Sequence, residues 1–170
     1  MTSPVGTAQT VVADDKRELL RHALATLAYR AGKALRGAPA GFAEFRAGDT
    51  TRTPGQILAH MGDLMDWALS MAAGNEQWSD SPVLAWEDGV SRLHRGMQSL
   101  DEYLASGKPL AVNPERLFQG AIADALTHTG QIALLRRMAS SPVKGENYSR
   151  AQIAAGRVGP EQAPPKREFD

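Results

Sequence analysis

The chain contains no cysteine, which excludes disulfide bonds, thiolate metal ligands and a cysteine nucleophile. It also lacks an excess of charge, because 19 Lys and Arg residues balance 19 Asp and Glu residues. No run of five or more basic residues occurs. A chain without a positive field or a basic run lacks the attraction on which nucleic-acid binding depends. We therefore expect no nucleic-acid partner.

Long apolar segments are missing as well. No stretch approaches the roughly 20 apolar residues that a helix needs to span a bilayer. The first residues, 1–8, lack the basic region and the long apolar region of a secretory signal. We therefore expect no membrane partner and a cytoplasmic location, with which the absence of cysteine agrees.

Four segments carry apolar residues at steps of three and four, the spacing of one face of a helix. They predict helices over about 13–35, from 53 to about 73, from 81 to about 106, and from 113 to about 139. Three of these segments begin with a capping residue followed by proline, a typical helix start: Thr53, Ser81 and Asn113. Asp14 and Asp15 at one helix start, and Arg136 and Arg137 at another helix end, suit the dipoles of their own helices.

Four amphipathic helices with no convincing strand between them indicate an all-α protein, a four-helix bundle. The connection over 37–53 is long enough to cross the end of the bundle, so we expect a crossover connection. We assign residues 1–140 to this bundle, with residues 1–12 flexible. Residues 141–170 form a C-terminal extension that is rich in Gly, Pro and charge, and we expect it to be partly disordered with one short helix near 149–155.

Three polar residues stand on helix faces that should be apolar. His60 lies on the line from Ile57 to Leu64, and Asp124 and His128 lie on the apolar stripe of the last helix. Their separation of four residues places Asp124 and His128 on one face, one turn apart. A polar group in a core costs free energy unless something compensates. Inward-facing side chains from two facing helices are how bundles build metal sites.

We therefore predict that His60, Asp124 and His128 hold a divalent metal ion. Two imidazoles and one carboxylate suit zinc, nickel or iron. Three protein ligands leave a position open for water or substrate, which is the catalytic rather than the structural arrangement. Gln131, one turn beyond His128, can orient a ligand or a bound water.

The same residues have simpler interpretations. A single histidine on an apolar face is more often a hydrogen-bonded core residue, and Asp124 and His128 can form an ordinary carboxylate–imidazolium pair. Of the other histidines, His22 is expected on the surface and His94 at the boundary of its helix. The chain has no phosphate-binding glycine loop, no G-x-S-x-G nucleophile turn and no paired Glu-x-x-His motif of a di-iron centre.

Two short segments resemble motifs of a known family. Ile-Leu-Ala-His-Met at 57–61 resembles the first metal-histidine motif of the DinB/YfiT-like metal-dependent enzymes. Asp-Ala-Leu-Thr-His-Thr-Gly-Gln-Ile at 124–132 looks like the motif on that family's last helix. The similarity extends through most of the chain in the order and spacing of the predicted helices.

The resemblance implies a four-helix bundle with a crossover connection, which holds a divalent metal through three histidines. Many members of the family are dimers. Characterised relatives include transferases that use low-molecular-weight thiols such as bacillithiol or mycothiol, and a mycothiol-dependent maleylpyruvate isomerase. Carried over by position, His60 and His128 are ligands, and Asp124 replaces the first histidine of the last-helix pair. A carboxylate still ligates metal, with a preference shifted toward harder ions.

The sequence thus predicts a divalent-metal-dependent enzyme, with a small-thiol-dependent S-transferase or a related hydrolase as its activity. Its cofactors would be the metal ion and a low-molecular-weight thiol, its substrate a small molecule, and its assembly a homodimer. A rival hypothesis is a metal-free, non-catalytic stress-response or ligand-binding bundle, whose buried polar trio fixes the register of the helices. A third is a purely structural subunit of a homodimer.

Overall fold

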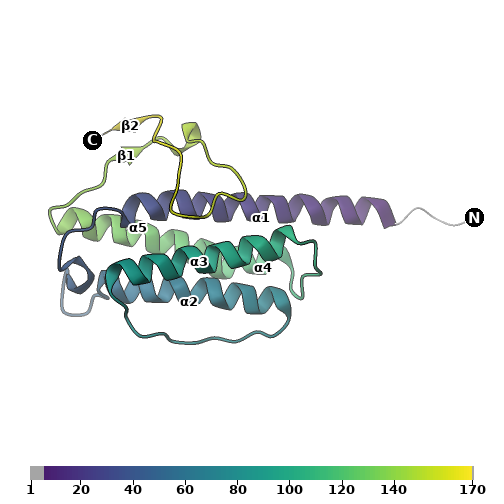
Figure 1. Ribbon diagram of the computed structural model, residues 1–170, viewed down its shortest axis with the longest axis horizontal. Helices are drawn as coiled ribbons and strands as arrows, with labels where there is room; N and C mark the ends of the chain where they lie inside the picture. Colours follow the sequence, from purple (N-terminus) through teal and green to yellow (C-terminus); the bar gives the residue numbers. More distant parts are fainter. Residues whose placement is uncertain (1–5, 170) are drawn as a thin grey trace, which may run out of the picture.

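A computed structural model describes the backbone of residues 6–169 and the side chains of residues 15–169. It is predominantly helical, which confirms the all-α class (Figure 1). The helices are α1 (Gly6–Leu35), α2 (Pro54–Ala73), α3 (Trp86–Ala105), α4 (Pro114–Leu117) and α5 (Ala123–Met138). Two 3-10 turns cover Phe42–Glu44 and Tyr148–Arg150, and the strands β1 and β2 cover Gly145–Glu146 and Glu168–Phe169.

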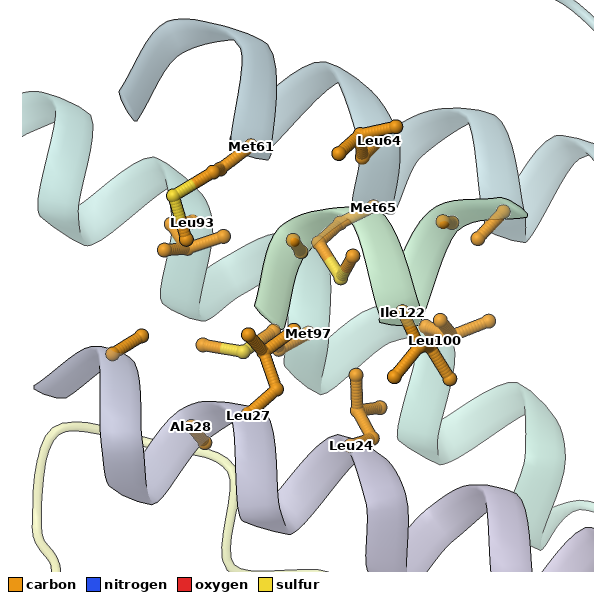
Figure 2. Packing of buried hydrophobic residues seen from close by; sticks show 14 of the residues in the cluster. Leu24, Leu27, Ala28, Met61, Leu64, Met65, Leu93, Met97, Leu100 and Ile122 are labelled. Carbon is orange, nitrogen blue, oxygen red and sulfur yellow. The ribbon is translucent and has the colours of Figure 1, made fainter. Parts of the chain in front are cut away.

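The long helices pack around a shared interior. Helix α1 contacts α3 and α5, and α2 contacts the same two helices from the other side. Apolar side chains from α1, α2, α3 and the turn before α5 meet there (Figure 2): Leu24, Leu27 and Ala28 of α1, Met61, Leu64 and Met65 of α2, Leu93, Met97 and Leu100 of α3, and Ile122 just before α5. Their burial confirms the apolar faces that the spacing predicts. No helix among the described residues combines the length and the apolarity needed to cross a membrane.

Local chemistry sets the bounds of α2 as predicted. The Thr53 hydroxyl accepts a hydrogen bond from the Gln56 amide at 3.2 Å, and the Gln56 side chain accepts one from the Thr53 amide at 2.9 Å. This reciprocal capping box satisfies two donors that the first turn leaves free. Gly74 ends the helix in the left-handed conformation, with φ 82°.

A glycine lets α3 approach α2 closely. A Cβ atom at Gly96 would lie 2.8 Å from the Cβ of Met65, which is too close for any side chain. Glycine costs a helix interior roughly 0.5–1 kcal/mol relative to alanine. At this crossing the cost is offset by the close packing of the two helices, which are in extensive contact.

Two predicted helix starts are wrong. Helix α1 begins at Gly6, so Asp15 lies well inside the helix and not at its positive end. Helix α3 begins at Trp86, five residues after Ser81, because the Ser81 amide donates to a carboxylate oxygen of Asp63 on α2 at 3.1 Å and stays in the loop. The predicted flexibility of residues 1–12 concerns residues 1–5, which lie outside the described residues, and residues 6–12, which belong to α1.

The last predicted helix is interrupted by a wider turn. A π-helical segment, Phe118–Ile122, separates α4 from α5 without breaking the chain of helical turns. Such a segment inserts one extra residue, which rotates the following face by roughly 100° relative to an uninterrupted helix. The buried face continues through the interruption, since Leu117 of α4, Ala121 of the π-helical segment and Ala125 of α5 are all buried.

Arg136 lies in the last turn of α5, as predicted, and its guanidinium also reaches the end of a neighbouring helix. Its guanidinium donates to the carbonyl oxygens of Ala34 at 3.1 Å, Arg36 at 2.9 Å and Gly37 at 3.0 Å. These carbonyls belong to the C-terminal end of α1, which carries unsatisfied acceptors and a partial negative charge. Arg136 is buried at 5% exposure, so it closes the end of α1 from inside the fold.

The C-terminal extension follows a defined path where the sequence predicts partial disorder. Residues 145–146 pair antiparallel with residues 168–169. Glu146 is buried and accepts hydrogen bonds from the Tyr29 hydroxyl at 2.7 Å and the Lys33 ammonium at 2.9 Å. His94 is buried, not at a boundary, with Nδ1 3.2 Å from the Val158 carbonyl oxygen. The extension thus lies over α1 and α3 (Figure 1).

Candidate metal centre

The three residues predicted to bind metal come together between α2 and α5. One ligand atom from each of His60, Asp124 and His128 lies within 4.8 Å of the others. His60 Nε2 is 3.4 Å from Asp124 Oδ2, and His128 Nε2 is 3.5 Å from Asp124 Oδ1. Ligands about 2.1 Å from a tetrahedral ion stand roughly 3.4 Å from one another. The group is therefore close enough to hold a metal ion.

The site lies at the edge of the core and opens toward solvent through the carboxylate. The side chain of Asp124 is 43% exposed, against 24% for His60 and 11% for His128. The two imidazole rings are nearly perpendicular, with centroids 4.9 Å apart. A molecule in solution can approach the group past Asp124, while the histidines are held by the packing around them.

Gln131 orients His128 as the sequence suggested. Its side-chain oxygen Oε1 lies 2.8 Å from Nδ1 of His128. Because Oε1 only accepts, Nδ1 carries the proton and donates this hydrogen bond. The lone pair of the neutral ring is then on Nε2, the atom that faces Asp124. This arrangement is the usual support for a metal-binding histidine, so the donor set fits a divalent ion.

Replacing Gln131 by leucine should lower the affinity for zinc roughly 10–100-fold, the usual effect of losing an outer hydrogen-bond partner of a ligand. The affinity is measured by competition with a chromophoric chelator. Gln98 on α3, which bonds to Glu102 at 3.0 Å, offers the matched control Gln98→Leu. Equal zinc affinities for the Gln131→Leu and Gln98→Leu variants would contradict the role assigned to Gln131.

Two tryptophans form an aromatic wall beside His60. The Trp78 ring lies 5.5 Å from the His60 ring and 5.7 Å from the Trp67 ring, centroid to centroid. Trp78 comes from the connection between α2 and α3, and its indole N–H donates to Asp80 at 3.0 Å. Sequence reasoning missed Trp78 because no helical spacing marks a loop residue. Trp67 of α2 is partly buried.

A buried ion pair holds that connection in place. Asp63 accepts from the Arg92 guanidinium at 2.7 Å as well as from the Ser81 amide. Burial alone would lower the pKa of Arg92, but its hydrogen bonds to Asp63 and Asp66 outweigh this and raise it. Asp63 therefore supports the wall beside His60 and is not part of the metal-ligand group.

Two cavities flank the three ligands. The larger, of about 590 Å³, reaches His128 and Gln131 and runs along α5. The smaller, of about 320 Å³, reaches His60 on the other side of the group. Arg52, from the connection that precedes α2, lines both cavities. Sequence reasoning gave no sign of Arg52, which stands in a polar loop without periodicity.

No family model, curated protein or solved structure matches the chain. The resemblance to the DinB/YfiT-like family therefore stays a prediction from two short motifs. The geometry of the site and the chemistry of its ligands are the observations that indicate a function.

Proposed function

We propose that this protein is a divalent-metal-dependent enzyme in which His60, Asp124 and His128 hold the ion. The observation that carries this proposal is the convergence of three ligand atoms from two helices within 4.8 Å. Zinc, nickel and iron all accept two imidazoles and a carboxylate. With three protein ligands, a further coordination position remains for a water molecule or a substrate atom.

The proposed reaction is the transfer of a small thiol, or a related hydrolysis. When bound, a divalent ion lowers the pKa of a coordinated water or thiol and so supplies a nucleophile near neutral pH. The chain contributes the remaining features: Gln131 fixes the tautomer of His128, and Trp67 and Trp78 shield one side of His60 from water. The exposed edge of Asp124 leaves a route for the second reactant.

We also propose that the fold is a four-helix bundle with a crossover connection of the DinB/YfiT-like kind, acting as a homodimer in the cytoplasm. The helix contacts support the bundle, because α1 and α2 each pack against both α3 and α5. Within the described residues, α1 and α2 make no extensive contact with each other. The connection that joins them would then cross from one corner of the bundle to the opposite one.

The test is to measure the metal content of protein purified without an affinity tag, and then its activity with that metal. We expect close to one ion per chain, together with thiol-transfer or hydrolase activity that a chelator removes and the same ion restores. A protein that takes up neither zinc, nickel nor iron on titration would contradict the proposal. That result would favour the metal-free, ligand-binding bundle.

A further inference from the structure

The larger cavity beside the metal centre is a mainly apolar groove with one arginine in its lining. From His128 and Gln131 it continues along α5 past Leu134 and Leu135 to Met138. Leu134 is 58% exposed and Met138 51% exposed, so the groove presents apolar side chains to solvent. The helix rises roughly 15 Å over the ten steps from His128 to Met138. The groove therefore suits a short, extended apolar group.

Arg52 lines this groove and also the smaller cavity, which reaches His60. Among the residues that line the groove, it is the one with a permanent charge, and no acidic side chain lines it. Within residues 15–169, the Arg52 side chain makes no hydrogen bond and no ion pair, whereas Arg92 and Arg136 are both engaged. In the smaller cavity, Asp63 is bound to Arg92 and Asp80 accepts from Trp78.

From this placement we infer that the substrate is a small amphiphilic carboxylate, whose anionic group binds Arg52 and whose apolar body lies in the groove along α5. This inference rests on the metal-centred enzyme proposed above and names its substrate class. A guanidinium matches a carboxylate with two parallel hydrogen bonds. Held in this way, the substrate has its charged end at Arg52 and its apolar end against the α5 side chains that line the groove.

Octanoate is a suitable probe, with 1-octanol as its neutral partner of equal chain length. Calorimetry on the protein as purified and after chelator treatment should show that octanoate binds to both forms. The Arg52→Gln variant should bind octanoate about 10–100-fold more weakly, the effect of losing a charge-assisted hydrogen bond. Its affinity for 1-octanol should not change. Arg95→Gln, at an exposed arginine on α3, is the control for the loss of a positive charge.

A second variant tests the apolar part of the groove. Leu134→Glu places an acid beside the bound chain and should weaken octanoate binding at least about tenfold, since like charges repel and apolar contact is lost. Leu19→Glu makes the same change at a similarly exposed leucine, 68% exposed, which lines a different cavity. It should leave octanoate binding unchanged and shows that the acid itself is tolerated.

The outcomes separate this inference from the metal proposal. The inference is overturned, whatever the metal content, if octanoate binds the Arg52→Gln variant and the parent protein with equal affinity. It is also overturned if octanoate does not bind the parent protein. Octanoate that binds only the metal-loaded protein, and equally well with Arg52→Gln, is a metal ligand and overturns it too. If the protein binds no metal but binds octanoate through Arg52, the metal proposal is wrong and the inference of an anionic ligand is supported.

Discussion

Replacing His128 by alanine should lower the affinity for zinc by more than about 100-fold. Losing an outer partner such as Gln131 costs roughly 10–100-fold, and losing a ligand from a three-ligand site removes more. A metal ion bound only to the folded protein would also stabilise the fold, by about 2.7 kcal/mol when its free concentration is 100 times the dissociation constant. The parent protein should therefore melt at a higher temperature with zinc than with a chelator, and the variant should not.

His22 offers the matched control, because it is an exposed histidine on α1, away from the three ligands. His22→Ala should bind zinc like the parent. An unchanged affinity in His128→Ala would show that zinc binds elsewhere. A parent protein whose melting temperature does not respond to zinc would indicate that His60, Asp124 and His128 form a hydrogen-bonded group without metal.

The candidate site could be predicted from the sequence because its residues break a rule. A histidine or a carboxylate within an apolar stripe is visible without any structure, and the spacing from Asp124 to His128 places both on one face. Arg52 and Trp78 could not be predicted, since both lie in loops. Their place beside the site depends on how the connections fold across it, and no local pattern reports that.

In the fold, too, the features that depend on local residues could be predicted and those that depend on distant contacts could not. The bounds of α2 follow from its own capping residues, which act within one turn. The start of α3 does not follow from local residues, because the contact between Ser81 and Asp63 joins residues 18 positions apart. The path of residues 141–169 depends on contacts that are longer still, such as Glu146 with Tyr29, 117 positions apart. Composition alone predicts disorder for that segment, and only its distant partners explain its order.

Those partners make Glu146 the main anchor of the extension. Its side chain has no exposed surface, and it lies between the Tyr29 hydroxyl and the Lys33 ammonium. Burial alone would raise the pKa of Glu146, but the hydrogen bonds from Lys33 and Tyr29 outweigh this and lower it. Lys33 has a second acidic partner, Glu168, at 2.7 Å. Removing Glu146 therefore leaves Lys33 charged and only partly compensated.

Glu146→Ala should lower the free energy of unfolding at pH 7 by about 3 kcal/mol, the lower end of the cost of breaking a buried ion pair. We expect the lower end of this range because Lys33 keeps its ion pair with Glu168 in the variant. Urea denaturation measures the change. The matched control is Glu168→Ala, which removes the partly exposed partner of the same lysine and should cost no more than about 1 kcal/mol. Similar losses for the two variants would show that burial of Glu146 adds nothing.

The pH dependence of this difference provides an independent check. The pKa of Glu146 is lower in the folded protein than its ordinary value of 4.5. The unfolded chain therefore takes up a proton more readily than the folded one, and acid favours unfolding. The stabilisation is complete above about pH 4.5 and is lost as the pH falls through the folded-state pKa. The free-energy difference between the parent and Glu146→Ala should thus be constant from pH 7 down to about pH 5 and shrink at lower pH, and a difference that grows in acid would mean that Glu146 is protonated in the fold.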